Sequence, residues 1–494
     1  MGATVNGGMK LTSDKLVLFP KIFRYLVFGA IMLLPFTDLP FFRTLFKEFA
    51  PMGSFYPMLL AIPVGLAMVP QYRSISIPRN ISCFLYLSFL LWAFVCSLAN
   101  LPIILDSFYK DRTGIGKLAS QMAVVCFSYM ATFFIYNILS RMDRPLEVLR
   151  KLINMGTCCA LAYGALELAF WFDIGGIRPG VVGLDKILHT ILTEEFAHMG
   201  RLRGLAMEPS LFAVFFSVGF PWMFYSAWTI RGATRIFYIV GVTLCAIMMY
   251  LTYSRIGYVV VLVQSLVFAV FLIAVWINKY QVSIKYVRRR WIFLFCGGAL
   301  LGITIFLWRE TAIRTVLYSL MDLTFPNNTV RYGSWQAGLN MAWAHPIVGV
   351  GIGQYGFYFS QYLPNWAMQI FGFSRFLDPL DYSTWVPAFS IHTRIFAETG
   401  IVGGILWLSI WFSTSTALVL HMFSNNDGAT GTRMVQAATL LASLVGLFIS
   451  GFNNDSFRFL ELSVTLAACW IFFRDCNNGV NLLFKNVWSC LCQK

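Results

Sequence analysis

Residues 256–277 read IGYVVVLVQSLVFAVFLIAVWI, a run without a single charged side chain. A helix needs about 20 mostly apolar residues to cross the hydrocarbon core of a bilayer. Inside that core no water can satisfy backbone N–H and C=O groups, so a spanning segment must be a helix or part of a closed barrel. The run therefore predicts a transmembrane α-helix.

The same pattern recurs along the chain. Similar apolar stretches occur at 24–41, 55–71, 80–103, 117–139, 152–172, 205–228, 236–252, 291–308, 399–423, 434–452 and 458–473. Hydrophobic residues make up 58% of the chain and charged residues only 12%, with a mean hydropathy of +0.69, whereas an ordinary soluble domain has about 25% charged residues. We therefore expect an all-α polytopic membrane protein with about 12 transmembrane helices.

Lysine and arginine are unevenly distributed between alternating segments. With both termini placed in the cytoplasm, 21 of the 37 Lys and Arg residues fall on inner segments, and the densest run lies at 278–290. The four short outer loops hold only seven of them. Cytoplasmic loops are rich in Lys and Arg, so this bias explains the net charge of +15 without a nucleic-acid partner.

Two predicted outer segments are long, and function is expected there. The chain accordingly divides into three parts. Residues 1–308 hold the first nine spans and the outer loop 173–204. Residues 309–398 are expected to form a large outer loop with short helices, and residues 399–494 to hold the last three spans and a cytoplasmic tail.

Motifs of soluble enzymes are absent or out of context. Residues 351–356 spell GxGxxG, but a dinucleotide site needs a preceding strand and a following helix, and here the motif lies in an outer loop. The sequence has no HExxH, Walker A or CxxC motif, and its five histidines do not cluster. We therefore expect neither a metal nor a cofactor.

Arginines occur in three short outer segments, against the general charge bias. Arg201 and Arg203 precede one span, Arg255 lies between two apolar runs, and Arg331 opens a helical stretch. Snorkelling to the headgroups explains Arg255 alone equally well. Four arginines at one membrane surface instead favour a diphosphate held at headgroup depth, because guanidinium groups bind phosphate through two parallel hydrogen bonds.

Acid–base groups and aromatic rings accompany these arginines. Glu208 lies just inside a span and is either functional or an ion-pair partner of a nearby arginine. His392 is a candidate general base, because the unperturbed pKa of histidine is near 6.5, and a packed or hydrogen-bonded histidine fits the sequence equally well. Sugars often stack on aromatic rings such as those of the long loop. Amphipathic interfacial helices also carry such rings, and this interfacial role is favoured for Trp366. Four residues are candidates for positioning the glycan or the loop: Tyr332, Trp335, His345 and Glu398.

Four motifs, in order, resemble those of bacterial O-antigen ligases and polymerases. The longest is RYGSWQAGLNMAWAHPIVGVG at 331–351, in which Arg and Trp open a helix and Pro and two Gly close it. Arg201-x-x-Gly204 resembles the earlier arginine motif, and Ser254-Arg255 resembles the Ser-Arg pair. Residues 397–403, AETGIVG, resemble the segment that follows the large periplasmic loop.

The resemblance implies a membrane glycosyltransferase of GT-C-like architecture in the bacterial inner membrane, with its active site facing the periplasm. It implies an undecaprenyl-diphosphate-linked oligosaccharide as substrate, undecaprenyl diphosphate as leaving group, and no metal or cofactor. The four arginines are then the diphosphate ligands, and Glu208 and His392 are the catalytic candidates.

Two departures favour a polymerase within this superfamily. Ligases usually have a His-Asn pair nine residues before the Glu of the AETG segment, and here Phe389 and Ser390 stand in that place. The Glu-Pro-Ser segment that begins at Glu208 also departs from the Pro-Asn form common in ligases. We therefore expect a polymerase of O-antigen or related repeat units, with membrane lipid and a chain-length regulator protein as partners.

Two other functions stay open. One is an O-antigen ligase that transfers glycan to lipid A core. The other is a polysaccharide or lipid transporter, which should carry its charged residues near the bilayer midplane rather than at one face.

The charge bias makes a testable prediction of topology. Cysteines introduced at positions 285 and 380 should differ in their reaction with a membrane-impermeant maleimide added from outside. Position 380 should be labelled and position 285 protected, because 309–398 is expected outside and 278–290 inside. The reverse pattern would overturn the orientation.

Overall fold

The computed structural model describes residues 13–68, 76–189, 200–278, 326–382, 384–423 and 430–492. Its first helices are α1 (Ser13–Met32), α2 (Arg43–Phe46), η1 (Lys47–Phe49), α3 (Phe55–Met68), α4 (Ile81–Ala99), α5 (Leu101–Asp106), α6 (Gly114–Leu139), α7 (Pro145–Trp171), η2 (Ile174–Gly176) and α8 (Arg178–Leu188). The next are α10 (Pro209–Thr229), α11 (Thr234–Leu251), α12 (Arg255–Asn278), α15 (Pro326–Ala344), α16 (Tyr355–Tyr362), α17 (Asn365–Met368), η4 (Phe371–Phe373), α18 (Ser374–Leu377), α19 (Ile391–Phe423), α20 (Thr430–Ser450) and α21 (Glu461–Cys492). A small antiparallel hairpin pairs β1 (Phe108–Tyr109) with β2 (Arg112–Thr113).

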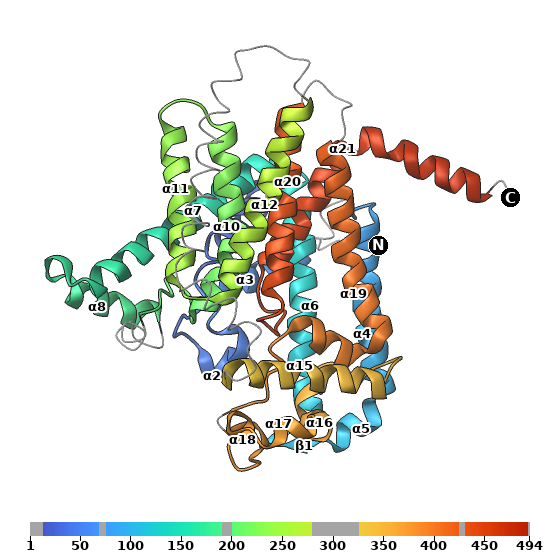
Figure 1. Cartoon of the computed structure of the whole chain (residues 1–494). Coiled ribbons are helices and arrows are strands. Elements are labelled where there is room, and N and C mark those ends of the chain that lie inside the picture. The colour runs from blue at the N-terminus through green and yellow to red at the C-terminus, as the bar shows by residue number, and fades with distance from the viewer. Residues whose placement is uncertain are drawn as a thin grey trace, which may run out of the picture.

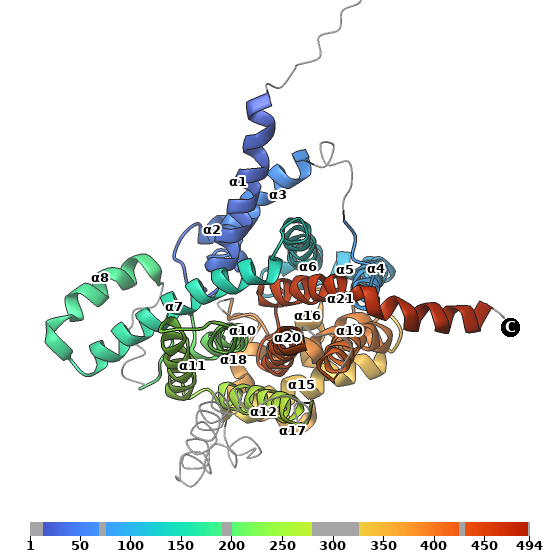
Figure 2. The same cartoon turned by 90° about the horizontal axis from the view of Figure 1, so that it is seen from above.

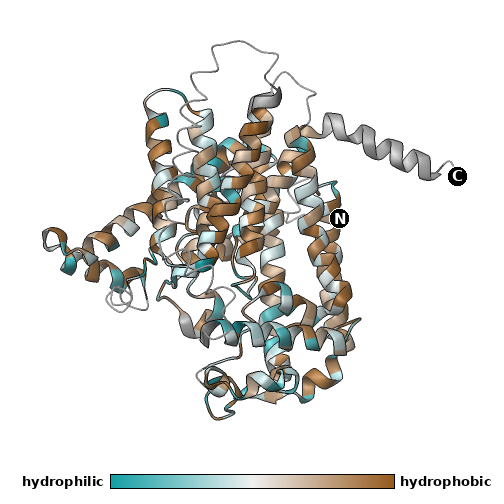
Figure 3. Ribbon diagram, in the orientation of Figure 1, coloured by the Kyte–Doolittle hydropathy of each residue, from teal (hydrophilic) through white to brown (hydrophobic). Residues whose placement is uncertain are grey.

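The chain is an all-α polytopic membrane protein, as the hydropathy pattern predicts. Within the described residues, eight helices are long and apolar enough to cross a membrane: α4, α6, α7, α10, α11, α12, α19 and α20. Figure 3 shows hydrophobic residues along these long helices. The expected span 291–308, the basic run after residue 278 and the first part of the long loop lie outside the described residues.

Helix α10 forms the centre of the bundle. It packs against α7, α11, α12 and α20. Of the 18 residues in its most apolar stretch, 94% are buried. In the corresponding stretches of α11 and α12 only 28% of the residues are buried. Most of the apolar surface of these two helices therefore faces outward, where it can contact lipid. Figure 2 shows this arrangement along the bundle axis, with α8 projecting away from the bundle.

The first expected span, 24–41, was wrong in its boundaries. Helix α1 covers Ser13–Met32, and residues 36–40 are not helical. Pro35 lacks a backbone N–H and disfavours helical geometry in the residue before it, so the helix ends there. The non-helical stretch brings Asp38 into the protein interior, where it is fully buried.

Short helices gather at one end of the bundle. Figure 1 shows α15 lying across the long helices, with α16, α17, α18, α5 and β1 beyond it. These elements have a hydrophobic core of their own, which includes Ala337, Phe359 and Phe373. We call this end of the molecule the α15 end. The described part of the expected long loop is therefore a folded layer of helices.

Helix α19 contains a break where it meets this layer. Gly400 has φ 71° and ψ −174°, so the nine residues before it form a separate helical segment. Backbone hydrogen bonds join this segment to the turn after α15: Val350 N donates to Ala397 O, and Ile401 N donates to Pro346 O. A Cβ at Gly349, which has φ 62°, would lie 2.5 Å from Ala397 O. Gly349 thus allows the turn after α15 to approach the backbone of α19 closely.

Candidate functional site

Backbone contacts bring two of the arginine motifs together. Leu202 N donates to Leu251 O at 2.9 Å, and Arg201 Nε donates to Thr252 O at 3.1 Å. The segment before α10 therefore lies against the turn that joins α11 to α12. Because Arg255 is the first residue of α12, the two motifs share one corner of the bundle.

The turn before α12 is short and well defined. Tyr253 adopts φ 46°, and Ser254 N donates to Thr252 Oγ1 at 3.1 Å. This geometry reverses the chain within three residues and places Arg255 at the start of the next helix. Its Nη1 then donates to Asn328 Oδ1, which connects α12 to the first turn of α15.

Arg331 lies one turn further along α15. Its Nη1 donates to Asn453 Oδ1 in the loop between α20 and α21, and its guanidinium lies 5.1 Å from the ring centroid of Phe389. Phe389 adopts φ 56°, and Asp455 Oδ2 accepts a 2.8 Å hydrogen bond from the preceding N–H of Ala388. The residue at the expected ligase-histidine position therefore faces this arginine.

Glu208 carries the negative charge among these arginines. It is exposed, it precedes α10, and its carboxylate accepts a 3.1 Å hydrogen bond from Ser210 Oγ. Burial lowers the pKa of Arg331, and the charge of Glu208 opposes this shift, whereas Arg255 and Arg201 reinforce it. Burial also lowers the pKa of Arg201, again opposed by Glu208. Arg201, Arg255, Arg331 and Glu208 thus form one electrostatic cluster, which we call the arginine site.

Arg203 has different surroundings. Its side chain is 0% exposed, and its Nη1 lies 3.2 Å from Asp38 Oδ2, while its Nη2 lies 4.0 Å from Asp185 Oδ2. Its backbone N–H donates to Glu167 Oε1 at 3.2 Å. The expected fourth diphosphate ligand is therefore a buried partner of carboxylates, and it anchors the segment that carries Arg201.

His392 has the packed, hydrogen-bonded surroundings that were the alternative to a general base. It is 4% exposed, its Nε2 bonds to Phe448 O at 2.9 Å, and its Nδ1 accepts from Trp407 Nε1 at 3.0 Å. A carbonyl can only accept, so Nε2 carries the proton and Nδ1 is occupied. In this arrangement neither ring nitrogen is available to take a proton from a substrate.

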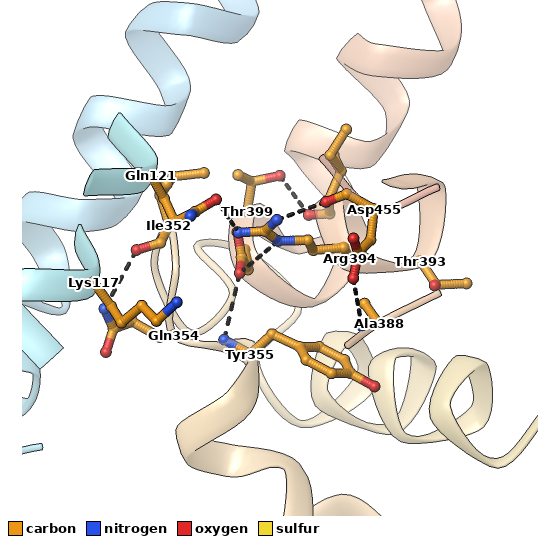
Figure 4. Close-up of polar contacts among 12 residues, drawn as sticks. Lys117, Gln121, Ile352, Gln354, Tyr355, Ala388, Thr393, Arg394, Thr399 and Asp455 are labelled. Atoms are coloured by element: carbon orange, nitrogen blue, oxygen red, sulfur yellow. Dashed lines mark hydrogen bonds and ion pairs between the residues drawn. The ribbon is translucent and has the colours of Figure 1, made fainter. Parts of the chain in front are cut away.

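Glu398 belongs to a buried charge network behind the arginine site. Arg394 Nε donates to Glu398 Oε1 at 3.0 Å, its Nη1 donates to Asp455 O at 2.6 Å, and its Nη2 donates to Gln121 Oε1 at 2.8 Å. Figure 4 shows Arg394 between Gln121 and Asp455, with Tyr355 and Lys117 nearby. This network fixes the relative positions of α6, α19 and the loop between α20 and α21.

Sequence reasoning missed the contribution of that last loop. Asn453 binds Arg331, Asp455 orients the Phe389 segment, and Arg458 Nη1 donates to Glu48 O at 3.4 Å. Glu48 in turn accepts from Gln121 Nε2 at 2.7 Å. The available signal was the run Asn-Asn-Asp at 453–455 between two apolar spans, where polar side chains without a function are costly.

The remaining expected positioning residues lie along α15. Tyr332 pairs with Trp366, with ring centroids 5.8 Å apart, and Trp335 lies against Phe452 at 6.1 Å. His345 Nε2 is 3.0 Å from Tyr362 Oη, beyond the far end of α15. Of these residues, Tyr332 and Trp335 lie next to the arginine site. His345 lies about 20 Å from Arg331 along the helix axis.

The arginine site suits an anionic ligand. Each of its arginines donates a hydrogen bond to a neutral oxygen, of Thr252, Asn328 and Asn453 respectively, and a neutral oxygen positions a guanidinium without cancelling its charge. Within the described residues, no group of three or more His, Cys, Asp or Glu side chains is close enough to hold a metal ion.

Comparison with known proteins supports the resemblance over part of the chain. Residues 240–408 match the family model described as O-antigen ligase. This region includes Arg255, Arg331 and Phe389, whereas Arg201 and Glu208 precede it. The loop containing Asn453 and Asp455 follows it. No curated protein matches the chain.

Two neighbouring arginines should respond differently to the same substitution. Arg203→Ala leaves Asp38 and Asp185 buried without their cation, which should cost about 3–5 kcal/mol of stability. Arg201→Ala should change stability by about 1 kcal/mol or less, because it removes one bond to a backbone carbonyl at a half-buried site. Thermal unfolding of the two variants in detergent measures the difference, and equal melting temperatures would contradict these separate assignments.

Proposed function

We propose that the chain is a membrane glycosyltransferase that polymerises lipid-diphosphate-linked repeat units of O-antigen or a related surface polysaccharide. The observation that carries this proposal is the arginine site, in which Arg201, Arg255 and Arg331 come from three separate segments and the charge of Glu208 acts on Arg201 and Arg331. The match of residues 240–408 to the O-antigen ligase model supports the same class of substrate. The enzyme would act in the bacterial inner membrane, with the α15 end in the periplasm and both termini in the cytoplasm.

In the proposed reaction the growing chain on its lipid diphosphate is the donor, and a single lipid-linked repeat unit is the acceptor. A hydroxyl oxygen of the acceptor bonds to the anomeric carbon of the donor as the bond from that carbon to the diphosphate oxygen breaks. The electron pair leaves with undecaprenyl diphosphate. Preorganised guanidinium groups stabilise this developing charge, the role that fixed cations play for transferring phosphates.

Glu208 is the proposed acceptor of the hydroxyl proton. It is exposed, and its charge acts on Arg201, Arg331 and Arg458, which supports a role for this carboxylate next to a bound diphosphate. A general base must come within hydrogen-bond reach of the proton that it removes. His392 is held by Trp407 and Phe448, which supports Glu208 over His392 for this step.

The surroundings of Arg331 support a polymerase over a ligase. The ring at its side is that of Phe389, at the position where ligases carry histidine. An O-antigen ligase is the second candidate, because the matching family model bears that description. The test is to incubate the pure protein with a defined lipid-diphosphate repeat unit. A ladder of products on lipid would establish the polymerase, and transfer that requires lipid A core would establish the ligase. If neither product forms, transport is favoured.

The arginines give the first functional prediction. Arg255→Ala or Arg331→Ala should lower turnover by about 100- to 1,000-fold, the usual effect of removing one electrostatic stabiliser. Lysine should restore little, because it lacks the planar fork. Product formation by purified protein measures this effect, and the exposed Arg375 of α18 provides the matched control as Arg375→Ala. Wild-type turnover in both site variants would remove the basis of the proposal.

The choice of base gives the second prediction. We expect Glu208→Gln to be inactive, because the amide cannot take a proton, and His392→Ala to remain active with a lower melting temperature, because a buried ring and two hydrogen bonds are lost. Turnover and lipid-diphosphate binding are measured for each variant. If His392→Ala abolishes turnover while binding persists, His392 is the functional base and the ligase interpretation recovers. Activity in both variants would mean that positioning and arginine electrostatics suffice without a base.

A further inference from the structure

Tyr332 and Trp366 form an exposed aromatic pair directly beside the arginine site. Their ring centroids are 5.8 Å apart and the ring planes differ by 32°. Tyr332 is 46% exposed and Trp366 is 40% exposed, although aromatic side chains of this size are usually mostly buried. Tyr332 follows Arg331 in α15, and Trp366 reaches the pair from α17.

A hydrogen bond fixes how this pair is presented. Trp366 Nε1 donates to Gln336 Oε1 at 3.1 Å. Because an indole N–H can only donate, the amide of Gln336 must point its oxygen toward the ring and its NH₂ away from it. Among the described residues no acceptor binds that NH₂, so its two N–H donors are available beside the aromatic faces.

Close packing beneath the pair holds the two helices in register. A Cβ at Gly333 would lie 2.7 Å from Phe373 Cζ and 3.2 Å from Ala367 Cβ. Helix α17 and η4 therefore pack directly on the backbone of α15 one residue beyond Tyr332. Ala367 and Phe373 are both 0% exposed, so the element that carries Trp366 is anchored next to the arginine site.

We propose that Tyr332, Trp366 and Gln336 form a binding subsite for a pyranose ring of the lipid-linked glycan. The inference rests on the proposed function of the arginine site, because Tyr332 follows Arg331 in α15 and is within reach of a glycan bonded to a diphosphate held by Arg331. A pyranose has an apolar C–H face and a rim of hydroxyl groups. Two flat aromatic rings match the face, and the free amide donors of Gln336 match the hydroxyl oxygens.

The geometry distinguishes this subsite from a membrane-interface anchor. An interfacial tryptophan turns its N–H toward headgroups or water, whereas that of Trp366 is held by a protein side chain. Trp343 of the same helix is 75% exposed. Within the part of the chain that the structure describes, it has neither a ring contact nor a hydrogen bond. Trp343 therefore provides a matched control for an exposed tryptophan outside the subsite.

The experiment compares two kinds of probe on full-length protein in detergent: a prenyl diphosphate without sugar, and the same lipid carrying one, two or three pyranose units. We expect at least one glycosylated probe to bind about tenfold more tightly than the bare lipid. Trp366→Ala should remove this advantage and leave the Kd of the bare lipid unchanged. Trp366→Phe should retain part of the advantage, Gln336→Ala should reduce it, and Trp343→Ala should retain all of it.

The possible results separate this inference from the function on which it rests. If no glycosylated probe binds more tightly than the bare lipid, or if Trp366→Ala keeps the advantage, the subsite is wrong while the arginine site stands. Equal weakening of both kinds of probe by Trp366→Ala assigns a structural role to Trp366 and also overturns the subsite. If wild-type protein does not bind the bare lipid, or if Arg331→Ala binds it as well as wild type, the proposed function fails and the subsite falls with it.

Discussion

The structure depends on how the guanidinium of Arg394, whose side chain is only 13% exposed, is satisfied where α19 meets the α15 end. A charge at such depth is stable only when it is paired and hydrogen-bonded. Arg394 meets that requirement through the carboxylate of Glu398, the backbone of Asp455 and the amide of Gln121. These partners belong to α19, the loop after α20 and α6, so the requirement of one side chain fixes three elements that lie far apart in the sequence.

The arginine site follows from that arrangement. Once the loop after α20 is fixed, Asp455 holds the segment that presents Phe389, and Asn453 holds Arg331. Arg394 and Arg203 are paired with carboxylates and serve the architecture. Hydrogen bonds from Arg201, Arg255 and Arg331 instead reach carbonyl and amide oxygens. Partner chemistry thus separates structural arginines from those suited to binding an anion.

Hydropathy predicted most of the spans, because a long uncharged run has few alternatives in a membrane. It misplaced the first span, where Pro35 ends the helix early. Motif spacing placed Arg201, Arg255 and Arg331 on one face, and the structure brings them together. It could not distinguish Arg203 from Arg201, because the deciding partner, Asp38, is 165 residues away. Asn453 and Asp455 were missed for a similar reason, since their role appears only when the last loop meets α15 and α19.

The position of that last loop has a consequence for biosynthesis. Ribosomes synthesise a chain from its N-terminus to its C-terminus. In the described part of the chain, one helix, α21, follows the segment 453–458. At every earlier stage of membrane insertion, Arg331 therefore lacks its partner Asn453, and Arg394 lacks its partner Asp455. The arginine site is therefore incomplete while the nascent chain is still being inserted into the bilayer. The arginine site is complete only after the loop between α20 and α21 has docked against α15 and α19.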